Sequence, residues 1–131
     1  MRALIVEDNF INRCVLLGIL NKYGECHIAV NGKEALKAFD EAYAEKKPYD
    51  LICLDIMMPE MDGHETLTHI RERERDMGID GLDGVKVIMT TAMADGKTIM
   101  SAFREQCEAY LLKPIDVQKL LAEVRKMGLI E

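Results

Sequence analysis

The chain has 131 residues, of which 49% are hydrophobic and 31% charged, a balance typical of one compact domain and not of a disordered tail. Its formal net charge of −6 argues against direct nucleic-acid binding, because that affinity comes mainly from cations that neutralise phosphates. The longest apolar runs are too short to cross a bilayer, and Glu7 and Asp8 lie where a secretory signal would need apolar residues. We therefore expect one domain over residues 1–131, cytoplasmic and without membrane insertion.

Cysteine and arginine usage also exclude some classes of site. The cysteines are widely spaced, with no Cys-x-x-Cys pair, and are expected to be buried thiols in a reducing compartment: Cys14, Cys26, Cys53 and Cys107. The arginine-rich stretch from Ile70 to Asp76 alternates Arg with Glu. This pattern predicts a solvated helix face with ion pairs and not a phosphate-binding patch.

The first half of the chain alternates short apolar runs with helical repeats. The apolar runs predict strands at Arg2 to Val6, Cys26 to Val30 and Leu51 to Asp55. After the first run, apolar residues recur at helical spacing and indicate a helix that ends near Gly24: Ile11, Val15 and Ile19. After the second run, Asn31 can cap a helix that has Glu34 at the capping-box position.

The second half continues the same alternation. A turn-rich segment, 57–63, precedes a predicted helix from about His64 to Met77 and a glycine-containing loop from Gly78 to Gly84. Further strands are expected at Val85 to Thr90 and Glu108 to Leu112, with a helix between Asp95 and Cys107. Pro114 breaks the chain, and Asp116 can cap a last helix with one apolar stripe: Val117, Leu120, Leu121, Val124 and Met127.

Five strand and helix alternations in so short a chain predict an α/β fold in which a parallel sheet has helices on both faces. Strand cores such as residues 51–54 lack polar alternation, as burial on both faces requires. In such folds the binding crevice lies at the carboxyl ends of the strands. The polar residues at these ends are therefore the candidates for function.

Reactive or polar groups follow four of the five predicted strands: Glu7 and Asp8, Asp55, Thr90 and Thr91, and Lys113. Three carboxylates at one edge would repel each other unless a cation is bound. Oxygen ligands suit a hard ion, and a site with few carboxylates that leaves room for water and phosphate oxygens favours Mg²⁺ over Ca²⁺. The acids therefore predict a magnesium site.

Four motifs, in order along the whole chain, resemble the response-regulator receiver family: Val6-Glu7-Asp8-Asn9, residues 54–63 (LDIMMPEMDG), Thr91-Ala92 and Lys113-Pro114. The resemblance implies a flavodoxin-like fold, a (βα)5 three-layer sandwich whose five-stranded parallel sheet has strand order 2-1-3-4-5. It also implies a single-domain response regulator of a two-component phosphorelay. The expected phosphodonor is a histidine kinase or a histidine phosphotransfer protein.

The resemblance also implies a role for each site residue. Asp55 would be the phosphoacceptor, and Mg²⁺ would be held by Asp8, Asp55 and the backbone carbonyl of Met57, with Glu7 reaching it through water. Lys113, before a proline that the family resemblance suggests is cis, would supply a second cation. Thr91 would hydrogen-bond the phosphoryl oxygens, and its movement would open space for Tyr110. These roles agree with phosphoryl transfer, in which the protein mainly positions groups and stabilises charge.

Some of these assignments have alternatives. Thr90 adjoins Thr91, and either could simply end a strand; Thr91 is preferred because Ala92 follows it, as in the family pattern. Tyr110 could be an ordinary core aromatic. A haloacid-dehalogenase-like phosphatase or phosphotransferase would also use a strand-end Asp, but it expects a second Asp at the position of Met57. A receiver-like binding module that never turns over phosphate would usually lack part of the acid, Thr and Lys set.

We expect output by protein binding, since no further domain pattern follows the last predicted helix. The resemblance places the downstream partner on the face formed by the helix between Asp95 and Cys107, the strand from Glu108 to Leu112 and the last helix. Activity is expected to be limited to self-phosphorylation from a phosphodonor and self-dephosphorylation. Met57 and Met93 would flank the path of attacking water, and neither thioether orients water well, so a persistent phosphoaspartate is expected.

Overall fold

The computed structural model describes residues 1–80, 83–92 and 107–131, and these residues form a five-stranded parallel sheet with helices on both faces. The strands are β1 (Arg2–Val6), β2 (Glu25–Ala29), β3 (Leu51–Asp55), β4 (Lys86–Thr91) and β5 (Ala109–Leu112). The described helices are α1 (Phe10–Leu20), α2 (Gly32–Ala44), α3 (Gly63–Asp76) and α5 (Val117–Lys126). The sheet order, β2-β1-β3-β4-β5, confirms the predicted fold class.

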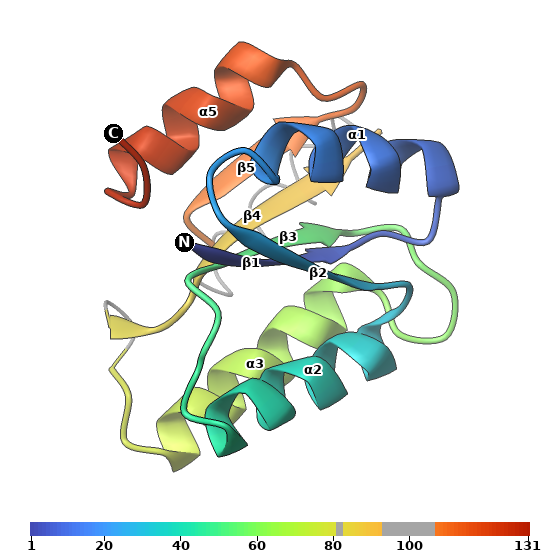
Figure 1. Ribbon diagram of the computed structural model, residues 1–131. Helices are drawn as coiled ribbons and strands as arrows, with labels where there is room; N and C mark the ends of the chain where they lie inside the picture. Colours follow the sequence, from blue (N-terminus) through green and yellow to red (C-terminus); the bar gives the residue numbers. More distant parts are fainter. Residues whose placement is uncertain (81–82, 93–106) are drawn as a thin grey trace.

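The sheet separates two hydrophobic cores. Helices α1 and α5 cover one face, and α2 and α3 cover the other (Figure 1). Strand residues alternate between the two cores, so that Ile5, Cys53 and Ile88 face α1 and α5, while Leu4, Leu54 and Met89 face α2 and α3. Because both faces are buried, the strands carry continuous apolar runs, which is why their sequences show no polar alternation.

Most predicted element ends agree with the observed ones to within one residue, but α1 ends at Leu20 and not near Gly24 as predicted. β1 and β3 have the predicted bounds, and β2 begins one residue earlier than predicted. The side chains of Asn31 and Asp116 cap α2 and α5 as expected, accepting hydrogen bonds from backbone N–H groups three residues later. The helix predicted between Asp95 and Cys107 falls on residues 93–106, which lie outside the described residues.

The exposed face of α1 was not expected. The repeat that indicates this helix includes Ile11, which is 70% exposed, and Val15, which is 41% exposed, whereas Leu16 and Leu20 are the buried residues. Cys14 is exposed on the same helix, so the prediction that all four cysteines are buried was wrong. Apolar periodicity therefore indicated a helix here, but of the three repeat residues only Ile19 packs against the core.

Two charged residues of α3 are buried, contrary to the predicted solvated face. Arg71 and Glu74 are each less than 5% exposed, and their side chains form a 2.7 Å ion pair. The Arg71 guanidinium also donates to the carbonyl of Val85 and contacts Glu108, while Glu74 accepts from the N–H of Val85. This network joins the end of α3 to the starts of β4 and β5, at the amino ends of the strands. Among the described residues, no helix is long and apolar enough to cross a membrane.

The start of α3 packs directly on the end of β3. Asp62 caps α3 by accepting a hydrogen bond from the N–H of Glu65, and the N–H of Gly63 donates to the carbonyl of Ile56. A Cβ atom at Gly63 would lie 2.4 Å from the carbonyl oxygen of Asp55 and 2.8 Å from Cα of Ile56. A glycine is therefore required here for the close approach of two backbones.

Gly63→Ala is expected to lower the free energy of unfolding by about 1–3 kcal/mol, because the added methyl group overpacks against backbone that cannot rotate away. The matched control is Gly18→Ala in α1, where an added Cβ meets nothing within 4 Å. That change should raise the free energy of unfolding by about 0.5–1 kcal/mol, since Ala has the higher helix propensity. Urea denaturation followed by circular dichroism measures both; an unchanged midpoint for Gly63→Ala would contradict the tight contact.

Candidate functional site

The polar residues singled out from the sequence lie at one edge of the sheet, at the carboxyl ends of its strands. Glu7 and Asp8 follow β1, Asp55 ends β3, Thr91 ends β4 and Lys113 follows β5. Since β1 and β3 are neighbours in the parallel sheet, with Val6 opposite Leu54, the acids of the two strands are brought side by side. These five predicted site residues are thus brought to this edge.

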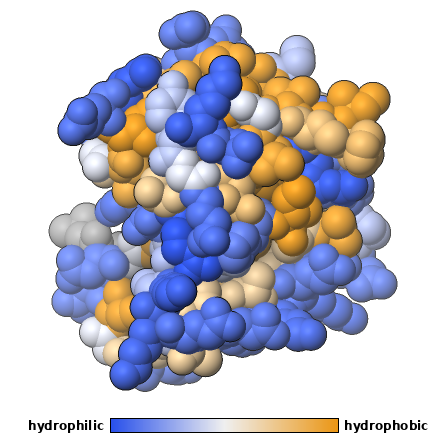
Figure 2. All heavy atoms as spheres, viewed as in Figure 1, coloured by the Kyte–Doolittle hydropathy of each residue, from blue (hydrophilic) through white to orange (hydrophobic). Residues whose placement is uncertain are grey.

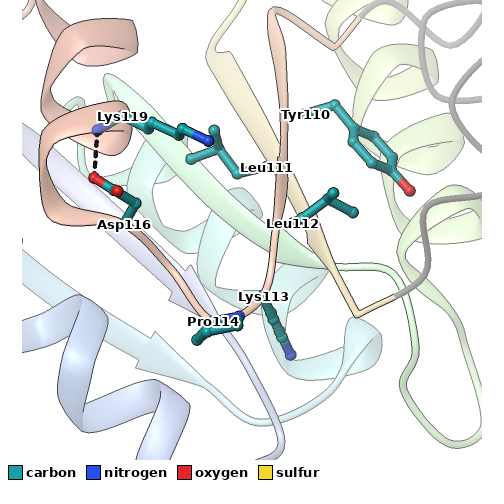
Figure 3. A pocket seen from close by; sticks show the side chains of 7 residues that line it. All are labelled: Tyr110, Leu111, Leu112, Lys113, Pro114, Asp116 and Lys119. Atoms are coloured by element: carbon teal, nitrogen blue, oxygen red, sulfur yellow. Dashed lines mark hydrogen bonds between the residues drawn. The ribbon is translucent and has the colours of Figure 1, made fainter.

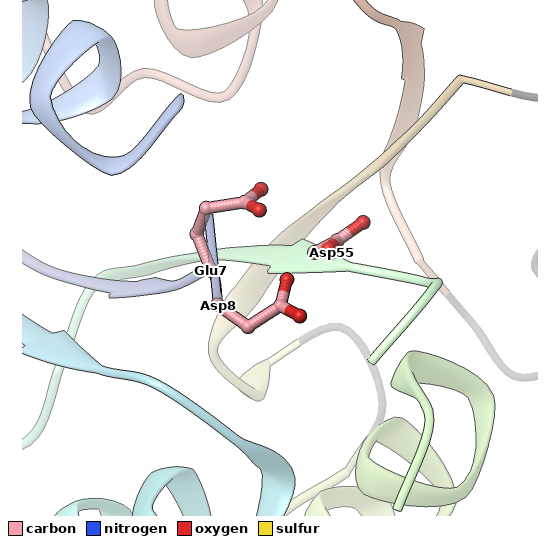
Figure 4. Close-up of side chains that lie close together, drawn as sticks. All are labelled: Glu7, Asp8 and Asp55. Atoms are coloured by element: carbon pink, nitrogen blue, oxygen red, sulfur yellow. The ribbon is translucent and has the colours of Figure 1, made fainter. Parts of the chain in front are cut away.

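The three acids form a cluster. One carboxylate oxygen each from Glu7, Asp8 and Asp55 can be chosen so that all lie within 4.8 Å of one another. Figure 4 shows Glu7 and Asp8 side by side with their carboxylates directed toward Asp55. Glu7 is fully buried and Asp55 only 2% exposed, whereas Asp8 is exposed to solvent. Two buried carboxylates and a third at the surface therefore enclose a space that can hold a cation.

Lys113 provides the positive charge that lies against the buried acids. Its Nζ atom lies 2.8 Å from Oε2 of Glu7 and 3.2 Å from Oδ1 of Asp55. The backbone N–H of Lys113 donates to the carbonyl of Thr91, and the Lys113–Pro114 peptide bond is cis, in agreement with the expectation from sequence. The end of β5 is thereby fixed against β4, with the lysine side chain directed across the sheet.

The charges at the site perturb each other. Burial raises the pKa of the Asp55 carboxyl to about 6, and the Glu7 carboxylate adds to this rise, while the Lys113 ammonium opposes it. The pKa of Lys113 is itself raised: burial alone would lower it, but its hydrogen bond to Glu7 and the charge of Asp55 outweigh that effect. The charged form of Lys113 is therefore favoured, whereas the charged form of Asp55 is disfavoured relative to an aspartate in water.

Met57 and Thr91 also lie where the sequence predicted. The N–H of Met57 donates to Oδ1 of Asp55 at 3.3 Å, so the loop after β3 lies beside the acid cluster. The Met57 side chain is 59% exposed. Thr91 is fully buried at the end of β4. Met93, the other methionine expected near the water path, lies outside the described residues.

Tyr110 lies in β5, partly buried against the core that faces α2 and α3. Together with Lys113 it lines a pocket of about 430 Å³ that extends to Asp116 and Lys119 at the start of α5. Figure 3 shows the Tyr110 ring and the Lys119 side chain on opposite sides of β5. Tyr110 and Lys113 of the site thus line the same pocket.

Two residues that contact Glu7, namely Asn9 and Arg13, were not assigned a role from sequence. The N–H of Asn9 donates to Oε1 of Glu7, and the Asn9 side chain caps α1 by accepting from the N–H of Asn12. The guanidinium of Arg13, one turn into α1, donates to the carbonyl of Glu7. The signal for Asn9 was its residue type directly before a helical repeat, which is typical of an N-cap.

Comparison with known proteins agrees with this geometry. Residues 3–125 match the family model for the response regulator receiver domain. The chain is 31% identical over 128 residues to the chemotaxis protein CheY of Listeria monocytogenes, covering 96% of this chain and 97% of that protein. It is also 32% identical over 128 residues to the hybrid signal transduction histidine kinase L of Dictyostelium discoideum, covering 97% of this chain. The chain spans only 4–8% of the length of three histidine kinases that it matches, of which histidine kinase L is one.

A solved structure shares the whole architecture. The Saccharomyces cerevisiae histidine phosphotransfer signaling protein Ypd1 has been crystallised with the receiver domain of its downstream response regulator Ssk1. The match has a TM-score of 0.86 and 29% sequence identity, and covers 98% of this chain and 88% of the matched one. The family match, a relative of nearly equal length and the shared sheet order agree, and the chain belongs to the response regulator receiver domain family of two-component signalling.

Proposed function

We propose that this receiver domain accepts a phosphoryl group on Asp55 in a Mg²⁺-dependent reaction and passes the signal on by binding another protein. The observation that carries this proposal is the buried Asp55 carboxylate, which lies against Lys113 on one side and within the acid cluster on the other. Receiver domains are phospho-accepting switches and generally not classical enzymes. Self-phosphorylation from a small phosphodonor and self-dephosphorylation are the reactions expected here.

The acid cluster fits a magnesium ion, and receiver domains bind Mg²⁺ at an acidic pocket. Its donors are all oxygens, and three carboxylates close together are stabilised by a divalent cation. Asp8, Asp55 and the backbone carbonyl of Met57 would hold the ion. Glu7 is already paired with Lys113, which supports a contact through water and not a direct one. When bound, the ion supplies positive charge that offsets the phosphoryl oxygens.

The remaining groups of the site divide the work of phosphoryl transfer. A carboxylate oxygen of Asp55 attacks phosphorus while the phosphorus–nitrogen bond of a phosphohistidine breaks, and the imidazole nitrogen leaves with the electron pair and takes a proton from solvent. Lys113 moves its ammonium onto a phosphoryl oxygen, and the Thr91 hydroxyl donates to another. These contacts form as the phosphoryl group is transferred and persist afterwards, so they stabilise the transition state and favour the phosphorylated conformation.

The output surface would include β5 and α5, together with the helix expected within residues 93–106, which lie outside the described residues. Leu112 of β5 and Val117 of α5 are 48% and 44% exposed, and both lie close to the pocket that Tyr110 and Lys113 line. A change at Thr91 and Tyr110 would reach this surface through β4 and β5, which are paired. A downstream protein bound there would sense the state of Asp55.

The phosphodonor protein would approach over α1. Apolar side chains gather over this helix (Figure 2), where Phe10, Ile11 and Val15 are exposed. Phe10 follows Asp8 by two residues, so the apolar surface begins at the rim of the acid cluster. The Ssk1 receiver was crystallised with a histidine phosphotransfer protein, which supports a partner of the same kind here. The haloacid-dehalogenase alternative has no support, since the matches are receivers and kinases and Met57 occupies the position of its second Asp.

Incubation with Mg²⁺ and phosphoramidate is expected to add one phosphoryl group to the protein, detected by intact mass spectrometry. Asp55→Asn should lose this uptake, because the amide is not a nucleophile, while Asp40→Asn, an exposed aspartate of α2 paired with Arg73, should keep it. Uptake by the Asp55→Asn protein would move the acceptor elsewhere. Rapid hydrolysis of phosphoramidate without a lasting adduct would favour a phosphatase.

Mg²⁺ affinity should depend on pH around the pKa of Asp55, which is raised to about 6 in the metal-free protein. Above this pH the carboxylate is free of its proton and affinity should be constant; below it, one proton competes with the ion and affinity should fall about tenfold per pH unit. Calorimetric titration well above and one unit below this pKa tests the expectation. Asp55→Asn should bind more weakly with little dependence on this range, and a pH-independent affinity for the unmodified protein would contradict it.

Met57→Asn is expected to shorten the lifetime of the phosphoryl group by several-fold, up to about tenfold, because an amide can orient an attacking water and a thioether cannot. Met77→Asn is the matched control: this half-exposed methionine follows α3 and should leave the lifetime unchanged. Loss of the mass adduct is followed over time with Mg²⁺ saturating. Equal lifetimes for Met57→Asn and the unmodified protein would show that the Met57 side chain has no role in hydrolysis.

A further inference from the structure

The hydroxyl of Thr90 is buried without a partner. Thr90 is fully buried in β4, and its Oγ1 atom makes no hydrogen bond within the described part of the chain. A threonine hydroxyl can donate one hydrogen bond and accept two, and burying it unpaired is unfavourable. Valine has nearly the same shape without this cost. A hydroxyl at such a position therefore calls for a functional partner.

The sheet register places Thr90 beside the reactive groups. Thr90 is paired with Asp55 of β3 on one side and with Leu111 of β5 on the other. Ile88, two residues earlier, faces the core beneath α1 and α5, and so do Cys53 and Ala109. Because side chains alternate along a strand, Thr90, Asp55 and Lys113 all lie on this same face.

Lys113 must cross β4 on the side where Thr90 lies. Its backbone follows β5, yet its Nζ atom contacts Asp55 of β3 and Glu7 after β1, and β4 lies between β5 and β3. An ammonium has three N–H donors, and the described contacts of Lys113 supply two acceptors, both of them carboxylates. The Thr90 hydroxyl, which lacks a partner, and the Lys113 ammonium, which has a further N–H to donate, therefore lie on the same face of the sheet at β4.

We propose that Thr90 is a positioning residue for Lys113, an inference that rests on the proposed phosphoacceptor role of Asp55. Its hydroxyl oxygen accepts a hydrogen bond from Nζ of Lys113 as the ammonium leaves the paired acids and moves onto the phosphoryl group. The hydroxyl thereby keeps the cation over Asp55 while its carboxylate partners change. Thr91, the adjacent residue, contacts the phosphoryl group itself, so the two threonines have different roles.

Thr90→Val tests this role, because it keeps the shape of the side chain and removes only the hydroxyl. Uptake of phosphoryl from phosphoramidate should slow by about tenfold, the effect of losing a hydrogen bond to a charged group, while resistance to urea stays equal or rises. Thr90→Ser should restore uptake to near the original rate. Thr66→Val is the matched control: its buried hydroxyl donates to the carbonyl of Asp62, so this change should lower stability and leave uptake unchanged.

A double-mutant cycle with Lys113→Ala separates positioning from packing. If Thr90 acts through the lysine, Thr90→Val should slow uptake in the original protein and cause no further loss when Lys113 is absent. Equal uptake by Thr90→Val and the unmodified protein would overturn the inference, as would a slow Thr90→Ser variant or fully additive effects with Lys113→Ala. Absence of uptake in the unmodified protein would instead overturn the proposed function together with this inference.

Discussion

The site depends on one electrostatic arrangement: two buried carboxylates, those of Glu7 and Asp55, lie against a single ammonium, that of Lys113. Two like charges in a region of low dielectric repel each other strongly, and one cation offsets that repulsion only in part. Burial, and after it the repulsion from Glu7, raise the pKa of Asp55 to about 6, and Lys113 opposes this rise. A buried carboxylate that is incompletely neutralised is stabilised by further positive charge, so this arrangement would favour a bound divalent cation.

The fold brings these charged side chains together because of the way its strands are arranged. Parallel strands end at one edge, so Glu7, Asp55, Thr91 and Lys113 arrive there from four strands through backbone geometry alone. The contacts that fix this edge are then short: Gly63 packs on the carbonyl of Asp55, and the N–H of Lys113 bonds to Thr91. These contacts fix the backbone on both sides of the site, and positioning of this kind is the main contribution a protein can make to phosphoryl transfer.

Most of this could be predicted from the sequence, because the determining signals are local. The apolar runs that end at Asp55 and just before Glu7 indicate the strands and the polar residues at their carboxyl ends. Capping residues such as Asn31 indicate where helices begin. The errors have a common cause. Periodicity cannot say which apolar face of α1 is buried when both carry apolar residues, and alternating charge cannot reveal that Arg71 is enclosed by β4 and β5. Those facts depend on tertiary contacts.

Two buried ionic clusters within residues 1–80, 83–92 and 107–131 differ in how completely they are satisfied. At the amino ends of the strands, Arg71 is bonded to Glu74 and to a backbone carbonyl, and Glu74 and Glu108 accept the N–H groups of Val85 and Val87. At the carboxyl ends, three carboxylates and one ammonium meet among the described residues, and these four groups carry a formal charge of −2. A buried ion pair that is joined to backbone groups by hydrogen bonds is a fixed structural element. Among the described residues the acidic cluster lacks this balance, so a bound cation would stabilise it, and its stability would then depend on what is bound.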